Sequence, residues 1–399
     1  MSTDLSGEKL PIKYSIRDTF QALYNTSVKL DLPVAIWKLP NQTAWELIIG
    51  EKTIELDSPQ IELLEPGFIV NKFRNRGLKK SLFIKAKFYI SNDFIDYSLI
   101  ETLLGKTFTE FFYKELSAIK KRIQFNIYLI ENKRNETLEF KNRVERAVEE
   151  INQGAFQKVI LSRRKEINFS EEVDHISIFE KLSQQNGNAF TSLVSIPEIG
   201  VWMGASPETL ICIKDNIFST CSLAGTQQFK ENVRLKDVLW SQKEIEEQAF
   251  VSRYIINCFK KIRLREYIEE GPKTVPAGKL LHLKTEFKVD MEEVDFPILG
   301  TQMLELLHPT SAVCGMPHEP AFEFILSQEN FDRELYAGYL GPVNINNSIG
   351  VFVNLRCMKI EGQKAILFAG VGITEDSDAE KEWLETEMKF GTLLNVLSN

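Results

Sequence analysis

Three side chains near the C-terminus have types and a spacing that suit the binding of an anion through a divalent cation. Glu382, Glu385 and Lys389 fall at positions i, i+3 and i+7 of an expected helix that ends near Leu397. At this spacing all three side chains project from one face of the helix. Two carboxylates can bind a hard cation, and the ammonium group can hold a negative charge of the ligand.

The segment before this helix predicts a backbone that can approach a ligand closely. The apolar run 365–369 is typical of a buried strand, and Gly370 and Gly372 follow it in the sequence Gly-Val-Gly-Ile. We expect a glycine turn there, because glycine has no side chain to keep a ligand away from backbone N–H groups. Ser377 and Glu380 have capping-box spacing and predict the start of the helix.

A second helix repeats the Glu-x-x-Glu spacing. Within the helical pattern of residues 234–264, Lys243, Glu244 and Glu247 share one face. One such pair is more often a solvated helix surface than a metal site. Two pairs on two helices would form a carboxylate quartet of the kind that Mg²⁺ requires, and spacing alone leaves both interpretations open.

Lys158 and Glu208 are charged residues inside apolar strand patterns, and each has two interpretations. Lys158 lies in the run 156–162 (FQKVILS), where it faces either solvent or a cavity that would lower its pKa and make it a general base. Glu208 follows Pro207, and it is either a turn carboxylate in water or a partly buried acid with a raised pKa. The spacing does not decide between these alternatives.

Arg356 is the clearest single-residue indication of an anionic ligand. It lies in the apolar run 351–356, which predicts a strand, and a buried arginine needs an anionic partner such as a carboxylate.

The small residues at 223–226 follow a strand pattern at 217–222 and predict another turn that can contact a ligand. His282, in an apolar Leu-Leu-His-Leu run, is expected to be a hydrogen-bonded core residue.

Composition and charge exclude several classes of function. The 399 residues are 43% hydrophobic and carry a formal net charge of −8, with one short basic run at Lys120-Lys121-Arg122. This charge argues against nucleic acid or an anionic membrane as the main partner. The five cysteines are scattered and form no CxxC pair, so we expect reduced thiols in a cytoplasmic protein. The sequence shows no signal-peptide pattern and no apolar run long enough to cross a membrane.

Local motifs of nucleotide, hydrolase and zinc chemistry are absent. The sequence has no P-loop, no GxGxxG dinucleotide motif, no nucleophile elbow and no set of zinc ligands. His308 and His318 lie in a proline-rich loop without other ligand types, and we assign them no metal role.

Hydrophobic periodicity predicts a chain rich in both strands and helices. Residues 1–137 carry no motif and are expected to be scaffold, with a helix at 15–31 and strands at 34–39, 45–49, 53–56, 67–73 and 82–90. From residue 138 onward we expect a helix that ends near Gly154, and further helices at 175–185, 297–307 and 319–328. The strands expected there include 189–196, 273–276, 280–289, 335–344, 350–358 and 365–373.

Eight motifs, in order and spacing, resemble those of the chorismate-utilising enzymes, a family that includes isochorismate, salicylate, anthranilate and aminodeoxychorismate synthases. The motifs are FQKVILSR, GASPETL, LAGT, KEIEEQ, LLHL, LHPTSAVCGMP, FAGVGI and EWLETEMK. The resemblance covers residues 138–397 of the motif-bearing catalytic part, 138–399, and is only diffuse in residues 1–137. It implies an α+β fold in a single chorismate-binding domain, 1–399, with large antiparallel β-sheets packed together, helices on the outside and the active site between them.

The resemblance also implies Mg²⁺ as the cofactor and a role for each candidate residue. The metal-binding glutamates of the family are matched by Glu247 and Glu385. The carboxylates that contact the metal through a water molecule, or that contact its ligands, are matched by Glu244 and Glu382. The groups that hold the substrate's carboxylates are matched by Arg356, Lys389 and the backbone of Gly370 to Gly372. The pocket-lining positions are matched by Gly225, His282 and Ala312.

Lys158 indicates which reaction of the family to expect. The ammonia-using synthases usually carry Gln at this position, whereas the water-using members carry Lys, because water must be deprotonated before it attacks C2 of chorismate. Glu208 matches the general acid that protonates the departing C4 hydroxyl. The resemblance therefore implies isochorismate synthesis for menaquinone or a catechol siderophore, with salicylate synthesis as the alternative. It also implies a monomer that binds chorismate and needs no amidotransferase subunit.

Overall fold

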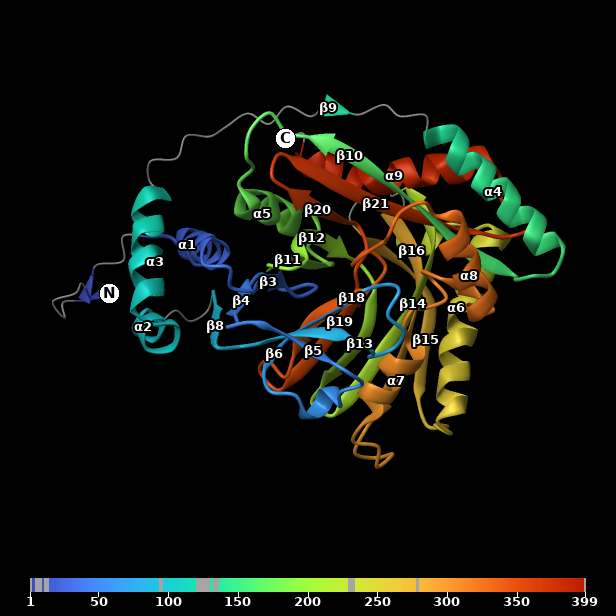
Figure 1. The fold of residues 1–399 in the computed structure, drawn as a ribbon. Helices are drawn as coiled ribbons and strands as arrows, with labels where there is room; N and C mark the ends of the chain where they lie inside the picture. The colour runs from blue at the N-terminus through green and yellow to red at the C-terminus, as the bar shows by residue number, and fades with distance from the viewer. Residues whose placement is uncertain are drawn as a thin grey trace.

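Two large antiparallel β-sheets form the centre of the computed structural model (Figure 1). The structure describes residues 2–3, 9–10, 14–92, 96–119, 130–131, 136–228, 234–277 and 280–397. The basic run Lys120-Lys121-Arg122 lies outside these residues. Within them, no helix is both long enough and apolar enough to cross a membrane.

The first sheet has ten strands among the described residues. Nine of them follow the order β17-β10-β21-β20-β12-β11-β3-β4-β8, and β9 pairs with β10. Their bounds are β3 (Val34–Lys38), β4 (Glu46–Ile49), β8 (Phe88–Ser91), β9 (Ile130–Glu131), β10 (Lys158–Asn168), β11 (Phe190–Ile196), β12 (Gly200–Ser206), β17 (Gly315–Met316), β20 (Cys357–Glu361) and β21 (Lys364–Ile373).

The second sheet has nine strands within the described ranges, in the order β15-β16-β14-β13-β19-β18-β6-β7-β5. Their bounds are β5 (Thr53–Leu56), β6 (Gly67–Asn71), β7 (Ser81–Lys85), β13 (Thr209–Lys214), β14 (Ile217–Gln228), β15 (Ile268–Ala277), β16 (Leu280–Asp290), β18 (Tyr339–Val343) and β19 (Ser348–Val353). Two short strands, β1 (Ser2–Thr3) and β2 (Lys9–Leu10), pair with each other. The α+β class and the antiparallel sheets are thus confirmed.

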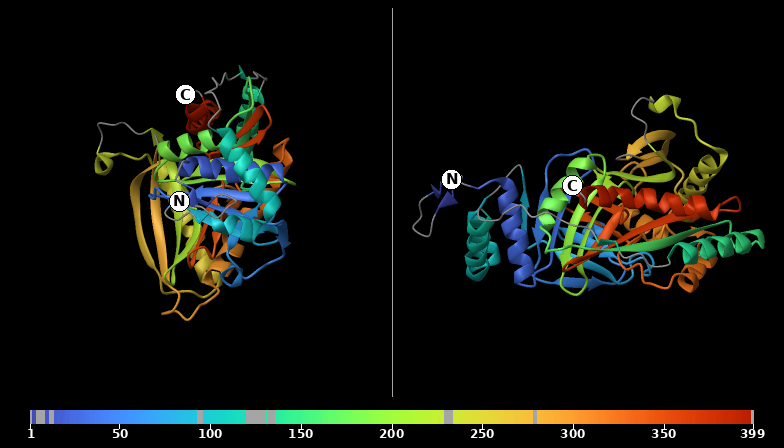
Figure 2. Two further views of the ribbon diagram at one scale, coloured as in Figure 1. Left: turned by 90° about the vertical axis from the view of Figure 1, so that its left-hand side faces the viewer. Right: turned by 90° about the horizontal axis from the view of Figure 1, so that it is seen from above.

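One group of helices packs against the outer face of the ten-stranded sheet and shares an apolar cluster with it. This group is α1 (Ile16–Lys29), α2 (Ser98–Leu104), α3 (Lys106–Ile119), α5 (His175–Gln185) and α9 (Ala379–Leu397). The other helices contribute to the cluster between the sheets and are α4 (Glu136–Asn152), α6 (Gln242–Lys261), α7 (Leu299–Leu307) and α8 (His318–Gln328). α9 runs alongside β21, near the C-terminus marked in Figure 2.

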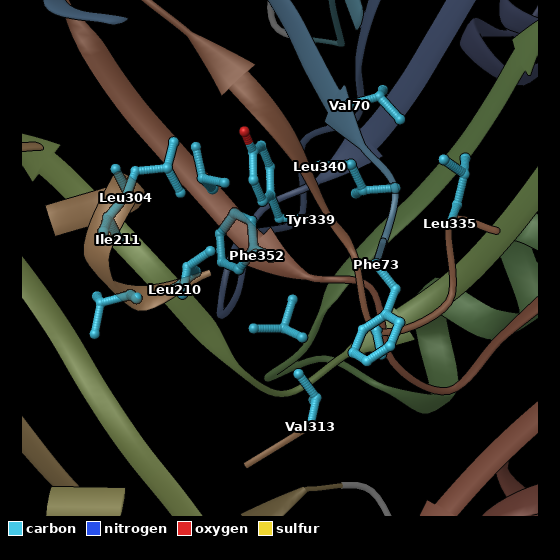
Figure 3. Packing of buried hydrophobic residues seen from close by; sticks show 14 of the residues in the cluster. Val70, Phe73, Leu210, Ile211, Leu304, Val313, Leu335, Tyr339, Leu340 and Phe352 are labelled. Atoms are coloured by element: carbon cyan, nitrogen blue, oxygen red, sulfur yellow. The ribbon is translucent and has the colours of Figure 1, made fainter. Parts of the chain in front are cut away.

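The space between the sheets is filled by apolar side chains from both (Figure 3). Val70 near the end of β6, Leu210 of β13 and Phe352 of β19 are each at most 4% exposed. Val313, at the edge of the same cluster, also lines the pocket described below. A close-packed interior resists small displacements, so the walls of that pocket rest on a rigid support.

The N-terminal third, residues 1–137, contributes strands to both sheets. It supplies β3, β4 and β8 to the first sheet and β5, β6 and β7 to the second. This arrangement supports the assignment of 1–399 to a single domain, which stays a prediction. All five cysteines are free thiols, as predicted.

Two expected strands are wrong, because the chain crosses between sheets within each of them. The run 82–90 is divided into β7 in one sheet and β8 in the other, and the run 350–358 is divided into β19 and β20. Apolar residues continue through both crossovers, since the two sheets share one core, so periodicity does not mark the break. Arg356 consequently lies in a connection with a φ of 47°, not in a strand.

Both predicted small-residue turns lie inside strands. β21 continues through the Gly-Val-Gly-Ile sequence, and Gly370 and Gly372 pair with Ser162 and Ile160 of β10. β14 likewise continues past residues 223–226 with a bulge between Ala224 and Gln227.

The predicted starts of two helices also differ from the structure. α6 begins at Gln242 rather than at residue 234. At the start of α9, Asp378 Oδ1 accepts a hydrogen bond from Lys381 N at 2.9 Å. Ser377 Oγ instead accepts from Thr374 N at 3.1 Å, so Ser377 stabilises the preceding turn and Asp378 caps the helix.

Candidate active site

A cavity of about 110 Å³ lies where the two sheets, α6 and α9 meet. Every candidate residue from the sequence lines it except Glu244 and Glu382. Its lining includes Lys158, Glu208, Gly225, Glu247, His282, Ala312, Arg356, Gly370, Gly372, Glu385 and Lys389. Residues separated by more than two hundred positions in the chain thus converge on one pocket.

Lys158 faces this cavity and not solvent. Its side chain is only 3% exposed, and it lies at the start of β10, where it pairs with Met316 of β17. Burial lowers the pKa of the Lys158 ammonium, because the charged form loses its hydration, and the carboxylate of Glu247 partly opposes this change. A lysine that is more readily neutral can accept a proton.

Glu208 lies in the short connection between β12 and β13 and is 4% exposed. Its backbone is held from two sides, since its N–H donates to Ser206 Oγ at 3.3 Å and its carbonyl accepts from Val353 N at 3.1 Å. Burial raises the pKa of Glu208 to about 8, against the opposing effect of Lys158. The carboxyl group is therefore protonated at neutral pH and can donate a proton.

Arg356, His282 and Gly225 form a chain of hydrogen bonds along one side of the pocket. Arg356 Nη2 donates to His282 Nε2 at 2.6 Å, and His282 Nδ1 lies 2.6 Å from the carbonyl oxygen of Gly225. A guanidinium can only donate and a carbonyl can only accept, so the proton of the imidazole must be on Nδ1. Burial, together with the nearby charge of Arg356, lowers the pKa of His282 to about 3, so the ring stays neutral and orients the guanidinium.

A side chain at Gly225 would be strained and crowded in this position. Its φ is +67°, and a Cβ atom there would lie 3.2 Å from both the Trp240 ring and Glu244 Cβ. Trp240 Nε1 donates to Thr274 Oγ1 at 3.0 Å, which fixes the ring above the glycine. Trp240 has no counterpart among the sequence-based predictions, because a lone aromatic residue carries no positional signal.

The two glutamates expected on one face of α9 are both paired with lysines. Lys389 Nζ lies 2.8 Å from Glu385 Oε1 and donates to the carbonyl of Gly370 at 2.8 Å. Glu382 is 2% exposed and is paired with Lys243 of α6 at 2.6 Å. Burial raises the pKa of Glu385, but Lys389 and Lys243 outweigh it, so the net effect is a lowered pKa.

The predicted quartet of glutamates is not gathered around one point. Among the described residues, no three His, Cys, Asp or Glu side chains lie close enough to hold one ion. Glu244 instead accepts a hydrogen bond from Ser241 N at 2.6 Å at the start of α6. Glu247 and Glu385 do line the same cavity. Two carboxylates that line one cavity suit Mg²⁺, which usually keeps several waters and binds through one or two carboxylates.

Tyr336 also lines the pocket, although the sequence predicts no functional role for it. It lies in the apolar run 335–344, for which the sequence predicts only a strand. A Cβ atom added at Gly370 would lie only 2.7 Å from the Tyr336 hydroxyl oxygen. No sequence signal distinguishes it from core residues. The glycine is thus needed for close packing against Tyr336.

Comparisons with known proteins agree with this fold. The model of the chorismate binding enzyme family matches residues 65–398. Isochorismate synthase EntC of Escherichia coli is 32% identical over 246 residues, which are 60% of this chain and 62% of EntC. The match thus spans less than two thirds of the length of EntC. Isochorismate synthase DhbC of Bacillus subtilis is 28% identical, over 65% of this chain and 67% of DhbC.

Two solved structures have the same fold. One is the crystal structure of a putative 2,3-dihydroxybenzoate-specific isochorismate synthase, DhbC from Bacillus anthracis. It aligns with a TM-score of 0.75 at 22% identity, and the alignment covers 96% of this chain and 100% of the DhbC chain. Anthranilate synthase component I of Streptococcus pneumoniae aligns with a TM-score of 0.64 at 19% identity, and the alignment covers 90% of this chain and 89% of the synthase chain. Since the family model matches most of the sequence, this chain belongs to the chorismate binding enzyme family.

Proposed function

We propose that this protein is an isochorismate synthase, which converts chorismate to isochorismate by adding water at C2 and releasing the C4 hydroxyl. The observation that carries the proposal is the presence of Lys158 and Glu208 in one buried cavity, with their pKa values moved in opposite directions towards neutrality. One group can then accept a proton and the other can donate one at the same pH. The names of several relatives, including EntC and DhbC, support the same reaction.

Lys158 acts as the general base. Its neutral amine removes a proton from a water molecule, whose oxygen forms the new bond to C2 of the substrate ring. The side chain passes over Gly372, which leaves the amine room to reach the cavity. Burial removes most of the hydration that the charged amine would have in bulk water, so its neutral form is available at a lower pH than that of an exposed lysine.

Glu208 acts as the general acid. As the ring double bonds shift, the bond from C4 to its hydroxyl breaks, and the carboxyl proton of Glu208 leaves with that hydroxyl as water. One proton is taken up by Lys158 and one is released by Glu208, so the reaction is neutral overall. Transfer of a proton back from Lys158 to Glu208 through solvent restores both groups.

Positive and polar groups of the pocket hold the substrate's two carboxylates. Arg356 presents a guanidinium whose direction is fixed by His282, and Lys389 presents an ammonium group next to Gly370. A fixed guanidinium can bind a carboxylate through two hydrogen bonds. These contacts orient the ring, so that C2 lies near Lys158 and the C4 hydroxyl lies near Glu208. The glycine backbone at 370–372 leaves space for this approach.

Mg²⁺ is the proposed cofactor, held by Glu247 and Glu385, with Glu244 and Glu382 supporting the site through water or neighbouring contacts. When bound, the ion neutralises a substrate carboxylate and fixes its position. The reaction uses water, so no amidotransferase subunit is needed, and we propose that the protein acts as a monomer in the cytoplasm.

The test is an incubation of purified protein with chorismate and Mg²⁺, followed by chromatographic separation of the products. Isochorismate should appear, and it should be lost with EDTA and in Lys158→Ala. The exposed Lys214 on β13 supplies the matched control, Lys214→Ala, which should retain activity. Salicylate with pyruvate would instead indicate a salicylate synthase. Turnover only with added ammonia would show that the role of Lys158 is wrong.

A further inference from the structure

A buried ion pair between Glu329 and Arg333 lies just behind the pocket. The two side chains are 2% and 1% exposed, and Arg333 Nη2 lies 2.6 Å from Glu329 Oε1. Arg333 Nε donates a second hydrogen bond to Glu329 Oε2 at 2.7 Å. The guanidinium also lies over the ring of Phe73, 4.2 Å from its centroid. Neither charged residue lines the cavity, and none of the roles proposed above uses them.

Arg333 connects two segments that form the wall around Lys158. Its Nη1 donates to the carbonyl of Val313 at 2.9 Å, and its Nη2 donates to the carbonyl of Ile160 at 2.8 Å. Val313 follows Ala312 in the proline-rich loop, and Ile160 follows Lys158 by two residues on β10. The N–H groups of a guanidinium have a rigid planar geometry. Together with the backbone hydrogen bond from Ile160 N to the carbonyl of Cys314 at 2.8 Å, this side chain therefore sets the separation of loop and strand.

Glu329 holds the next segment of the same strand. Its Oε1 accepts hydrogen bonds from Ser162 N at 2.8 Å and from Ser162 Oγ at 2.7 Å. β17 pairs with β10 only at Lys158 and Val159. Beyond the end of β17, the side chain of Glu329 therefore supplies the hydrogen-bond acceptor for the backbone of β10 at Ser162.

Stability alone is a weak explanation for such a pair. Removing two charges from water is costly, and replacing a buried ion pair by apolar residues of similar volume often leaves a protein equally stable or more stable. An apolar pair, however, cannot donate to two carbonyl groups or accept from a strand N–H. What the charged pair supplies is therefore the relative position of the segments that it bonds.

We propose that the Glu329–Arg333 pair is a positioning device, which holds the start of β10, and with it the amine of Lys158, at a fixed distance from the loop that carries Ala312 and Val313. The inference rests on the function proposed above, because it concerns the placement of the base in that reaction. A misplacement of about 1 Å can reduce a reaction rate by about 100-fold.

The Arg333→Lys variant tests this role. A lysine keeps the positive charge beside Glu329 but lacks the planar fork that reaches both carbonyl groups. We expect kcat to fall about 10- to 100-fold, with a much smaller change in KM, because the displaced group acts in the chemical step. The acid limb of the kcat profile should also move to higher pH, since a loosened wall admits water to Lys158 and weakens the effect of burial.

Two further variants separate positioning from folding. Arg17, which pairs with Asp174 and Glu180 on the outer helices, supplies the matched control. Arg17→Lys should leave both kcat and the acid limb unchanged. The double variant Glu329→Leu/Arg333→Met should give a cooperative thermal transition and still show the reduced kcat. A loss of folded protein alone would lower the amount of activity without moving the acid limb.

Amide hydrogen exchange in β10 provides a readout that does not depend on catalysis. Exchange at residues 158–162 should be faster in Arg333→Lys than in the wild-type protein. If the wild-type protein forms no isochorismate and this exchange still accelerates, the proposed function fails while the positioning device is supported. Unchanged exchange, kcat and acid limb in Arg333→Lys would overturn the positioning device.

Discussion

Gly372 lies directly against the side chain of Lys158. A Cβ atom at residue 372 would come within 2.9 Å of Lys158 Cε and 3.4 Å of Lys158 Nζ. The amine therefore uses space that only a glycine leaves open. Because Gly372 pairs with Ile160 in the same sheet, the backbones of β21 and β10 together determine where the proposed base can lie.

Gly372→Ala should therefore move the amine of Lys158 away from its position. We expect kcat to fall by about 100-fold. The free energy of unfolding should change much less than in a typical overpacked core, because the nearest atom belongs to the flexible end of a lysine side chain. Steady-state kinetics and urea unfolding measure the two effects. Gly187→Ala is the matched control, because no heavy atom lies within 4 Å of its added Cβ. Full activity of Gly372→Ala would contradict the contact.

The pH dependence of kcat/KM should have two limbs. Lys158 acts in its neutral form, so activity is lost as pH falls through its lowered pKa. Glu208 acts in its protonated form, so activity is lost as pH rises through about 8. In Glu208→Gln the upper limb should disappear and kcat should fall about 10²- to 10⁴-fold. An unchanged upper limb in this variant would show that another group supplies the proton.

His282→Leu should weaken the binding of chorismate. The change removes the acceptor for Arg356 and leaves the carbonyl of Gly225 without its donor. We expect KM to rise about tenfold, and the free energy of unfolding to fall by about 1–3 kcal/mol. The control is His175→Leu, which breaks a hydrogen bond to Tyr24 in the outer helices and should reduce stability without raising KM. An unchanged KM in His282→Leu would mean that Arg356 needs no support from the imidazole.

Binding of Mg²⁺ should depend on Glu247 but not on its neighbour. Isothermal titration calorimetry of Glu247→Gln should show an affinity at least about tenfold weaker than that of the wild-type protein, because one of two charged ligands is lost. Glu246 is exposed and lies outside the cavity, so Glu246→Gln should bind like the wild type. Equal affinities of the two variants would move the metal site away from Glu247.

Elements with strong local patterns were predicted well. The expected helix 175–185 has the bounds of α5, and the expected face of Glu382, Glu385 and Lys389 is present on α9. The spacing of residues along one helix depends only on helix geometry, so it can be derived from near neighbours. Strand ends were less predictable, because the runs 82–90 and 350–358 remain apolar while the chain changes sheets.

Residue types, helix faces and the order of the motifs were determined by the sequence alone, and they were enough to indicate the family. The environment of each group was decided only by the tertiary structure. Residue spacing did not decide whether Lys158 faces solvent or a cavity. It also did not reveal that Lys243 pairs with Glu382, 139 positions away. Burial, pKa values and ion pairs depend on segments that are distant in the chain, so they exist only once the two sheets have packed together.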